Sequence, residues 1–243
     1  MMDPRKFLRK IFPQAIKNVG VPRKICGKWI ILPLEIARYF PAKYEPEKFR
    51  FISDHAFGIG LDLGAHVGLF TVELSKKCEK VVAFEPTTDT RKILTQTLLL
   101  NGCKNVEIRD DIVGDKVGGI DFYVTNDVAS CLNSTAPIGR LVRKNSVTID
   151  SLNIRVDYIK MDIEGSEYRA LSGAINTLKQ VQYMSLEVHP KLLKMQGDSP
   201  NDIFNLLSSY SPEYFLDGKA VTAESLRLLD EIFEINVKLN TAG

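Results

Sequence analysis

Residues 60–68 read Gly-Leu-Asp-Leu-Gly-Ala-His-Val-Gly, and they join an apolar run to a stretch with helical spacing. The run over residues 58–63 predicts the end of a buried strand, and the apolar positions of residues 67–77 predict a helix. Gly64 and Gly68 let the backbone between these elements come close to a ligand. The stretch therefore predicts a strand, a turn and a helix that together bind a nucleotide-like molecule.

The order of residues in this turn differs from that of dinucleotide-binding turns. Those turns carry three glycines as G-x-G-x-x-G, whereas this one reads D-x-G-x-x-x-G and begins with Asp62. A carboxylate here would repel a pyrophosphate, but it would suit a cofactor that carries an amino group and a sulfonium. The pattern therefore favours S-adenosylmethionine as the cofactor.

A further acid follows the next predicted strand. Residues 80–84 form a short β-branched run that leads into Glu85, about twenty residues beyond the glycine turn. A carboxylate at the end of a second parallel strand can accept hydrogen bonds from both hydroxyls of a ribose. Dinucleotide enzymes share this feature, so only its combination with Asp62 favours a methyltransferase over a dehydrogenase. In the alternative interpretation, Glu85 caps the strand and contacts solvent.

The composition fits one α/β domain with ordinary charge. The chain has 243 residues and a formal net charge of +2. Its four cysteines lie far apart without a C-x-x-C pair, which argues against a zinc module or a disulfide framework and fits a reducing cytosol. We find no apolar stretch of membrane-spanning length and no cleavable signal pattern, and we therefore expect a cytoplasmic protein.

Positive charge is concentrated near the N-terminus. Eight lysine and arginine residues precede residue 30, against the single acid Asp3. Apolar residues at helical spacing among them would allow peripheral contact with an anionic membrane, although Pro13 keeps such a helix short. A solvated helix that leans on the domain is the favoured alternative. The segment contains no recognisable nucleic-acid-binding module, so we expect no nucleic-acid partner.

The chain divides into a lead-in and a regular domain. Residues 1–56 carry several prolines and short apolar runs, and we expect a helical or irregular, basic lead-in that helps to cover the active site. Residues 57–243 form a single domain in which strands alternate with helices, which predicts a mostly parallel sheet. Residues 117–150 interrupt the alternation and predict an insertion near the substrate, with strands at 120–124 and 146–149.

The remaining predicted elements complete the sheet and its helical layers. Two late strands joined by a turn would form an antiparallel edge. The predicted strands cover residues 58–63, 80–85, 105–109, 156–161, 182–188, 213–216 and 233–239, and the predicted helices cover residues 67–77, 88–101, 165–179, 200–209 and 222–231.

Polar residues follow the later strands, where ligands of open parallel sheets bind. Asp110 and Asp111 follow the third strand, where an acid can accept a hydrogen bond from an adenine amino group or simply form a turn. Asp162 and Glu164 follow the fourth strand and open a helix. A helix N-cap is the alternative role of Asp162, and favourable charge at the helix N-terminus is the alternative role of Glu164.

Glu187 and His189 follow the fifth strand. His189 and Asp162 are the candidate general bases, with His189 titrating near neutral pH, although a lone histidine often makes only a structural hydrogen bond. Asp162, Glu187 and His189 also suit Mg²⁺, Mn²⁺ or Zn²⁺ as ligands. A divalent metal is therefore an alternative that we do not favour from the sequence.

Five segments, in this order, resemble the FkbM-type methyltransferases, a branch of the class I S-adenosylmethionine-dependent enzymes. They lie within about residues 55–190 and read GLDLGAHVGLF, AFEP, VGDKVG, DYIKMDIEGSEYRALSG and SLEVHP. The resemblance implies a Rossmann-like α/β fold, with a mostly parallel seven-stranded sheet, helices on both faces and an antiparallel edge strand. It also implies O-methylation of a hydroxyl in a sugar, a glycolipid or a polyketide-like metabolite, with the acceptor left open.

The resemblance further implies roles for single residues. The family usually has Asn where this chain has His66, and an imidazole can still donate a hydrogen bond to the cofactor carboxylate. Asp62, Gly64, Ala65, His66 and Gly68 would hold the methionine end, Glu85 the ribose and Asp111 the adenine, while Asp162 would lie near the sulfonium and Glu164, Glu187 and His189 would line the acceptor pocket.

Two other functions stay open at this point. An NAD-dependent enzyme is disfavoured because the glycine triplet is missing and Asp62 is misplaced for a pyrophosphate. A catalytically degenerate module that binds the cofactor and acts as a partner for other proteins is disfavoured because the glycine turn and the strand-end acids are intact.

Overall fold

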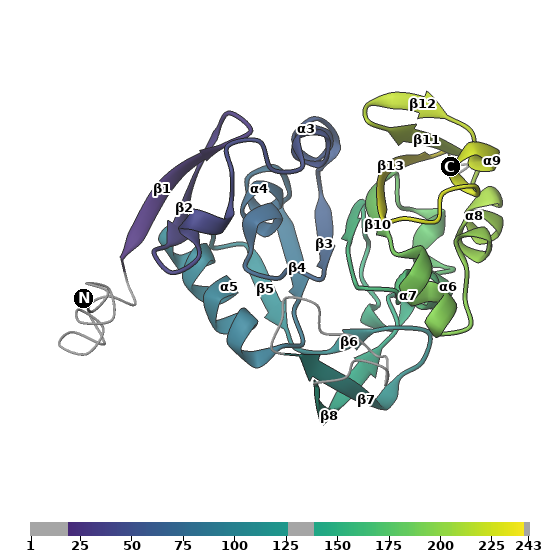
Figure 1. Cartoon of the computed structure of the whole chain (residues 1–243), viewed down its shortest axis with the longest axis horizontal. Coiled ribbons are helices and arrows are strands. Elements are labelled where there is room, and N and C mark those ends of the chain that lie inside the picture. Colours follow the sequence, from purple (N-terminus) through teal and green to yellow (C-terminus); the bar gives the residue numbers. More distant parts are fainter. Residues whose placement is uncertain (1–18, 126–138, 241–243) are drawn as a thin grey trace.

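The computed structural model describes residues 19–125 and 139–240, and a single large sheet organises them (Figure 1). Its strands are β3 (Ile59–Leu63), β4 (Lys80–Phe84), β5 (Val106–Arg109), β9 (Tyr158–Met161), β10 (Tyr183–Val188), β11 (Pro212–Leu216), β12 (Lys219–Val221) and β13 (Phe233–Leu239). The strand order is β12-β11-β13-β10-β9-β3-β4-β5. The five strands from β10 to β5 run parallel, and β13, β11 and β12 add antiparallel pairs.

The predicted α/β fold and antiparallel edge are confirmed, but the sheet has eight strands instead of the predicted seven. The additional strand is β12, which pairs with β11 across a tight turn at Asp217 and Gly218. Both turn residues have a positive φ, a conformation typical of two-residue hairpin loops. Residues 222–231, predicted as one helix, form only the short helix α9 (Ala223–Leu226).

Helices cover both faces of the sheet (Figure 1). Helices α3, α4 and α5 lie on one side, and α6 to α9 lie on the other. The predicted helix over residues 165–179 is interrupted at Gly173, where a Cβ atom would lie 2.3 Å from the carbonyl oxygen of Gly114. The bounds are α3 Pro46–His55, α4 Leu69–Lys77, α5 Thr88–Leu100, α6 Glu167–Ser172, α7 Pro190–Met195 and α8 Pro200–Ser208, with short 3-10 helices at Ala37–Tyr39, Asp150–Leu152 and Thr177–Lys179.

Alternation along the parallel strands separates two apolar cores. Leu61 and Leu63 pack into the core that includes α6 and α8. The residue between them, Asp62, faces the opposite side and contacts Thr71 of α4. Because successive side chains of a strand point to opposite faces, polar residues of neighbouring strands can meet on one face without disturbing the other core.

The lead-in contains a β-hairpin that the sequence analysis did not predict. Strands β1 (Gly20–Ile25) and β2 (Lys28–Pro33) pair across Cys26 and Gly27, which both have positive φ. The hairpin packs beside α5, where the Asn101 side chain bonds both the N–H and the carbonyl of Ile31. The predicted membrane-binding helix falls on residues 1–18, which lie outside the described residues. Within the two described ranges, no helix combines the length and apolar character that a bilayer span needs.

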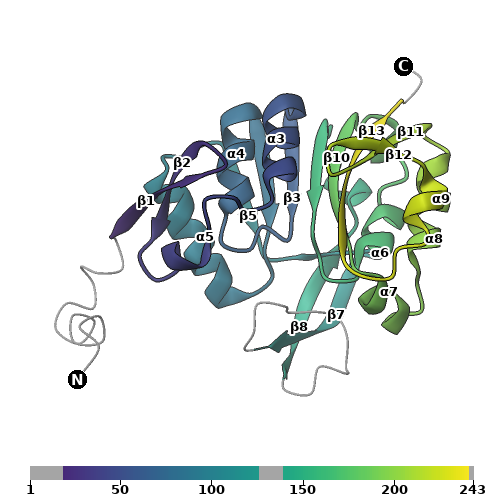
Figure 2. The same cartoon turned by 45° about the horizontal axis from the view of Figure 1, so that its top comes forward.

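The predicted insertion forms a separate three-stranded sheet in the order β6-β8-β7. Its strands are β6 (Ile112–Val113), β7 (Gly118–Thr125) and β8 (Gly139–Val147), so β8 begins well before the predicted residue 146. Figure 2 shows β7 and β8 projecting from one end of the main sheet. Strand β6 directly follows β5, which places this small sheet at the carboxyl ends of the parallel strands.

Candidate active site

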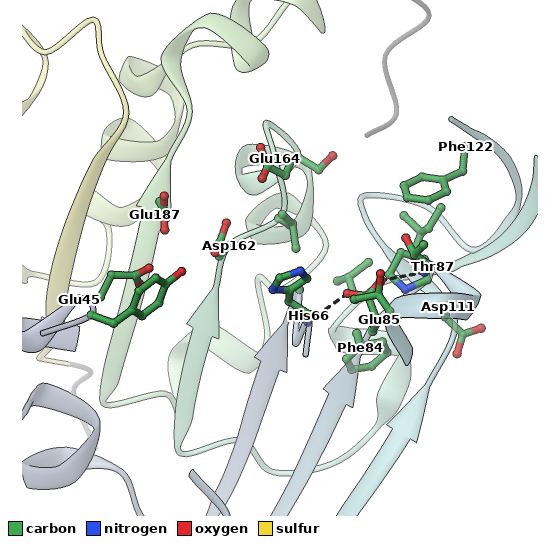
Figure 3. Close-up of a pocket in the computed structure, with 18 residues that line it drawn as sticks. Glu45, His66, Phe84, Glu85, Thr87, Asp111, Phe122, Asp162, Glu164 and Glu187 are labelled. Atoms are coloured by element: carbon green, nitrogen blue, oxygen red, sulfur yellow. Dashed lines mark hydrogen bonds between the residues drawn. The ribbon is translucent and has the colours of Figure 1, made fainter. Parts of the chain in front are cut away.

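A cavity opens at the carboxyl ends of the parallel strands (Figure 3). Its walls come from the ends of the main strands, from the lead-in and from the small sheet. Seven residues predicted for the site line it, namely Gly64, His66, Glu85, Asp111, Asp162, Glu164 and Glu187. The other four, Asp62, Ala65, Gly68 and His189, are absent from its lining.

The glycine turn brings the end of β3 against the end of β9. Gly64 has a φ of 77°, and a Cβ atom there would lie 1.8 Å from the carbonyl oxygen of Asp162. The N–H groups of Gly64 and Ala65 both donate to the carbonyl oxygen of Phe84, at 3.1 and 2.9 Å. Only glycine combines this φ with such a close backbone approach. The turn therefore requires glycine at residue 64, and the hydrogen bond from the Ala65 N–H to Phe84 stabilises it.

Gly68 ends the turn and begins α4. It caps that helix with a φ of 90°, and a Cβ atom would lie 2.7 Å from the Leu94 side chain. Gly68 therefore allows α4 and α5 to pack closely, and its part in holding the methionine end stays a prediction.

Glu85 is buried at the end of β4 and is fixed by two backbone groups. The N–H of His66 donates to Oε2 at 3.0 Å, and the N–H of Thr87 donates to Oε1 at 2.8 Å (Figure 3). Burial raises the pKa of Glu85, and these hydrogen bonds partly oppose that shift. Each oxygen keeps lone-pair capacity for a further donor. The side chain thus lines the cavity in a fixed orientation, unlike a strand cap in solvent.

His66 lies beside Glu85 with a φ of 50°, in the left-handed region. Asn and His tolerate this region better than most residues, which gives a physical reason for Asn or His at this position. Burial, followed by the charge of Lys160, lowers the pKa of the His66 ring. The imidazole is therefore neutral at pH 7 and offers one donor and one acceptor to the cavity.

Asp62 lies beneath the turn and is fully buried. Thr71 Oγ1 donates to its Oδ2 at 2.6 Å, and Lys160 Nζ lies 3.3 Å from its Oδ1. Lys160 Nζ also donates to the Gly64 carbonyl at 2.8 Å. Asp62 therefore supports the turn through Lys160, and its role in holding the methionine end stays a prediction.

Lys160 is a site residue that was not predicted from the sequence. It lies opposite Asp62 in the register of β3 and β9, and it is only 2% exposed. The available signal was a lysine in the middle of the apolar run Tyr158–Met161, because a buried lysine needs a charged partner.

Asp111 lines the cavity beside β5, but its carboxylate already has strong partners. The Arg109 guanidinium donates to its Oδ2 at 2.8 Å, and Asn145 Nδ2 donates to its Oδ1 at 2.6 Å. Asn145 belongs to β8, so Asp111 also joins the small sheet to the main one. These hydrogen bonds leave fewer lone pairs of the carboxylate free to accept a hydrogen bond from a ligand.

A group of acids surrounds His189 at the ends of β9 and β10. Nδ1 of His189 lies 2.9 Å from Oε1 of the buried Glu167. Nε2 lies 3.4 Å from Glu164 Oε2, 3.9 Å from Glu187 Oε1 and 4.0 Å from Asp162 Oδ1. Burial opposes the charged imidazole, but the hydrogen bond and charge of Glu167, with the other acids, raise the pKa of His189 to about 9. His189 is therefore protonated at neutral pH, which argues against the predicted role as a general base.

The three cavity acids differ in their proton affinity. Burial raises the pKa of Asp162, but Lys160, Lys48 and His189 outweigh it and keep that pKa below its ordinary value. Burial raises the pKa values of Glu164 and Glu187, in both cases with neighbouring acids adding to the shift.

Lys48 of α3 is a second buried cation that the sequence analysis missed. It is 0% exposed and contacts Glu45, Glu187 at 3.1 Å and Glu234 at 3.4 Å. Burial lowers the pKa of Lys48, but Glu234, Glu45 and Glu187 outweigh that and raise it overall. Lys48 therefore anchors Glu187 at the cavity wall.

Two regions outside the main sheet also contribute to the wall. Tyr44 and Glu45 come from the lead-in, immediately before α3, and Phe122 comes from β7 of the small sheet. The sequence predicts that both regions approach the site, but no pattern in it marks these particular residues.

The replacement Glu234→Gln is expected to stabilise the protein at pH 8 but not at pH 4.5. Burial, with the charges of Glu45 and Glu187 opposing that of Lys48, raises the pKa of Glu234 from 4.5 to about 7. The neutral carboxyl of Glu234 makes its full contribution to the free energy of unfolding below pH 4.5. This contribution, about 3 kcal/mol, is lost as the pH rises through 7. Glutamine cannot ionise, so the variant should gain on the wild type over this range. Urea unfolding of both proteins at pH 4.5, 6 and 8 measures the gain, and a pH-independent difference would contradict the assignment.

The sequence profile described as Methyltransferase FkbM domain matches residues 62–214, more than half of the chain. A curated relative, the Hexuronic acid methyltransferase AglP of Haloferax volcanii, is 26% identical over 151 residues, which make up 60% of each chain. The chain thus matches less than two thirds of the length of that relative.

Solved structures are similar at lower identity. Methyltransferase FkbM from Methylobacillus flagellatus KT is 19% identical with a TM-score of 0.49, over 76% of this chain and 43% of that one. Trm5 from Methanocaldococcus jannaschii, in complex with adenosine, is 14% identical with a TM-score of 0.49, over 92% and 56%. The matched profile describes methyltransferases, which argues against the NAD-dependent alternative. The match over residues 62–214 shows that this protein belongs to the Methyltransferase FkbM domain family.

Proposed function

We propose that the protein transfers a methyl group from S-adenosylmethionine to a hydroxyl of a sugar or a similarly hydroxylated metabolite. The observation that carries the proposal is the position of Glu85, buried at the end of β4 and oriented by the N–H groups of His66 and Thr87. A carboxylate held in this way can accept hydrogen bonds from two neighbouring hydroxyls of a ribose.

The residues along the cavity fit this cofactor. Gly64 leaves room for close approach to the turn, and the neutral His66 ring can donate to a cofactor carboxylate. When bound, S-adenosylmethionine supplies a methyl group already activated by its sulfonium. The task of the protein is to align the acceptor oxygen with that methyl group and to exclude water.

The acceptor side of the cavity is rich in carboxylates. Asp162, Glu164 and Glu187 line it together with Glu45 and Tyr44. Carboxylates accept hydrogen bonds from hydroxyls, and a sugar presents several hydroxyls at once. The name of the Haloferax relative, a hexuronic acid methyltransferase, supports a sugar as the acceptor class.

Glu187 is the best candidate for the group that accepts the proton of the reacting hydroxyl. Its raised pKa makes it a stronger base than Asp162, whose pKa is lowered by Lys160 and Lys48 against the effect of burial. Lys48 holds Oε2 of Glu187 at 3.1 Å, which fixes the side chain. In this assignment Asp162 and Glu164 position the acceptor.

The cofactor assignment predicts micromolar binding of S-adenosylhomocysteine, and Glu85→Gln should weaken it by about tenfold to a hundredfold. This range corresponds to the loss of hydrogen bonds to a charged group, about 1.5–3 kcal/mol. Calorimetric titration measures the affinity. The control is Glu107→Gln, because Glu107 is an exposed carboxylate of β5 that pairs with Lys80. If the wild type does not bind S-adenosylhomocysteine, the proposal is overturned. If both variants lose affinity equally, Glu85 does not bind the ribose.

A further inference from the structure

The two ring nitrogens of His189 have different partners: Nδ1 is hydrogen-bonded to Glu167, whereas Nε2 faces Asp162 and Glu164 at longer distances. The side chain is 3% exposed, and Nδ1 is bonded to Glu167 Oε1 at 2.9 Å. In the protonated ring both nitrogens carry a proton; a bound cation would displace the proton of Nε2 and leave Nδ1 bonded to Glu167, so that the Nε2 lone pair would face Asp162 and Glu164. Nε2 makes no hydrogen bond to any residue in the described ranges. A buried imidazole oriented by a carboxylate on its other nitrogen is a recurrent arrangement for a metal ligand.

The spacing of the atoms around Nε2 suits a cation better than a hydrogen bond. Nε2 lies 3.4 Å from Glu164 Oε2 and 4.0 Å from Asp162 Oδ1, and one ligand atom from each residue can be chosen within 4.8 Å of the others. Ligand atoms about 2.1 Å from a metal ion lie about 3.0–3.4 Å apart in octahedral or tetrahedral geometry. Small side-chain rotations would therefore bring all three to ligand distance.

Negatively charged side chains outnumber positively charged ones around the ring of His189. Four carboxylates lie within 4.0 Å of the His189 ring, those of Asp162, Glu164, Glu167 and Glu187. The two lysines that contact Asp162 and Glu187 are already shared, since Lys160 also pairs with Asp62 and Lys48 pairs with three glutamates. Within the described part of the chain, His189 is the basic group that pairs with Glu164. A divalent cation would compensate this excess of negative charge.

We propose that Asp162, Glu164 and His189 form a binding site for a divalent cation of the Mn²⁺ type. Two carboxylates and one imidazole form a ligand set that Mn²⁺ accepts. Asp162 and Glu164 line the cavity, so a cation held there keeps coordination positions open to a ligand in the cavity. Its role would be to bind oxygens of the acceptor, including those of an acidic sugar that the carboxylates alone would repel. That role rests on the proposed function, whereas the cation site itself does not.

Titration of chelator-treated protein with Mn²⁺ alone tests the site, with the electron paramagnetic resonance signal of free Mn²⁺ as the readout. We expect one bound Mn²⁺ per chain and at least tenfold weaker binding after Glu164→Gln or His189→Gln. Glu167→Gln, which leaves the ligands in place, should weaken binding by about tenfold to a hundredfold. The matched control is Glu234→Gln, which removes a carboxylate from the same acidic region without removing a ligand, and it should bind Mn²⁺ nearly as the wild type does.

Two outcomes would overturn the site. The first is no uptake of Mn²⁺ by the wild type, and the second is an equal loss of uptake in Glu164→Gln and Glu234→Gln, which would indicate diffuse attraction. Thermal melting of each variant separates loss of a ligand from loss of folding. Calorimetry with S-adenosylhomocysteine on the same samples separates this proposal from the proposed function, because neither titration requires the other to succeed.

Discussion

Replacing Glu187 by glutamine is expected to lower the turnover number by about 10²–10⁴-fold, the usual contribution of a general base. Glutamine keeps the size of the side chain and removes the oxygen that accepts a proton. Binding of S-adenosylhomocysteine should stay within about twofold of the wild type, a change well below the loss of one hydrogen bond. The measurement is single-turnover transfer of labelled methyl from S-adenosylmethionine to an acceptor found by screening sugars.

The matched control for Glu187→Gln is Glu234→Gln. Glu187 and Glu234 are register partners in β10 and β13, and both contact Lys48. Only Glu187 lines the cavity. Both replacements remove one negative charge from Lys48, so a general electrostatic effect would lower turnover in both variants alike. That result would contradict the assignment of Glu187 as the base.

Replacing Gly64 by alanine is expected to destabilise the protein by more than about 3 kcal/mol, beyond the usual cost of overpacking. The added Cβ atom would lie 1.8 Å from the Asp162 carbonyl oxygen and 2.9 Å from the carbonyl carbon, and backbone atoms of a buried strand end cannot move aside freely. Separating β3 from β9 would also disturb the hydrogen bond from Lys160 to the Gly64 carbonyl. Urea unfolding measures the loss of stability.

The control for Gly64→Ala is Gly197→Ala. Gly197 has a similar positive φ of 85°, and an added Cβ atom there would have no neighbour within 4 Å. This control carries only the conformational cost of a non-glycine residue at positive φ, about 1 kcal/mol. Equal destabilisation of the two variants would mean that the close approach of Asp162 carries no cost.

The sequence was informative where structure depends on neighbours along the chain. Residues 58–63 and 80–85 alternate between two apolar cores as β3 and β4, and the intervening turn has the glycine that its φ and close packing require. Glu85 directly follows β4 and Asp162 directly follows β9, and both line the cavity because parallel strands end at one edge of a sheet. These features follow from local periodicity and one topological rule.

The tertiary structure alone decided which charges meet. Lys160 is opposite Asp62 only because β9 pairs with β3, and Lys48 reaches Glu187 only because α3 of the lead-in packs against that end of the sheet. The same holds for His189, which the sequence presented as a candidate base. Its proton affinity depends on Glu167 and Glu164, which arrive from another strand end and helix. The sequence by itself thus determined the parallel core and the place of the site, because both follow from local pattern. Pairing between distant elements set the charge of each site residue, because electrostatic interactions depend on distance in space and on burial.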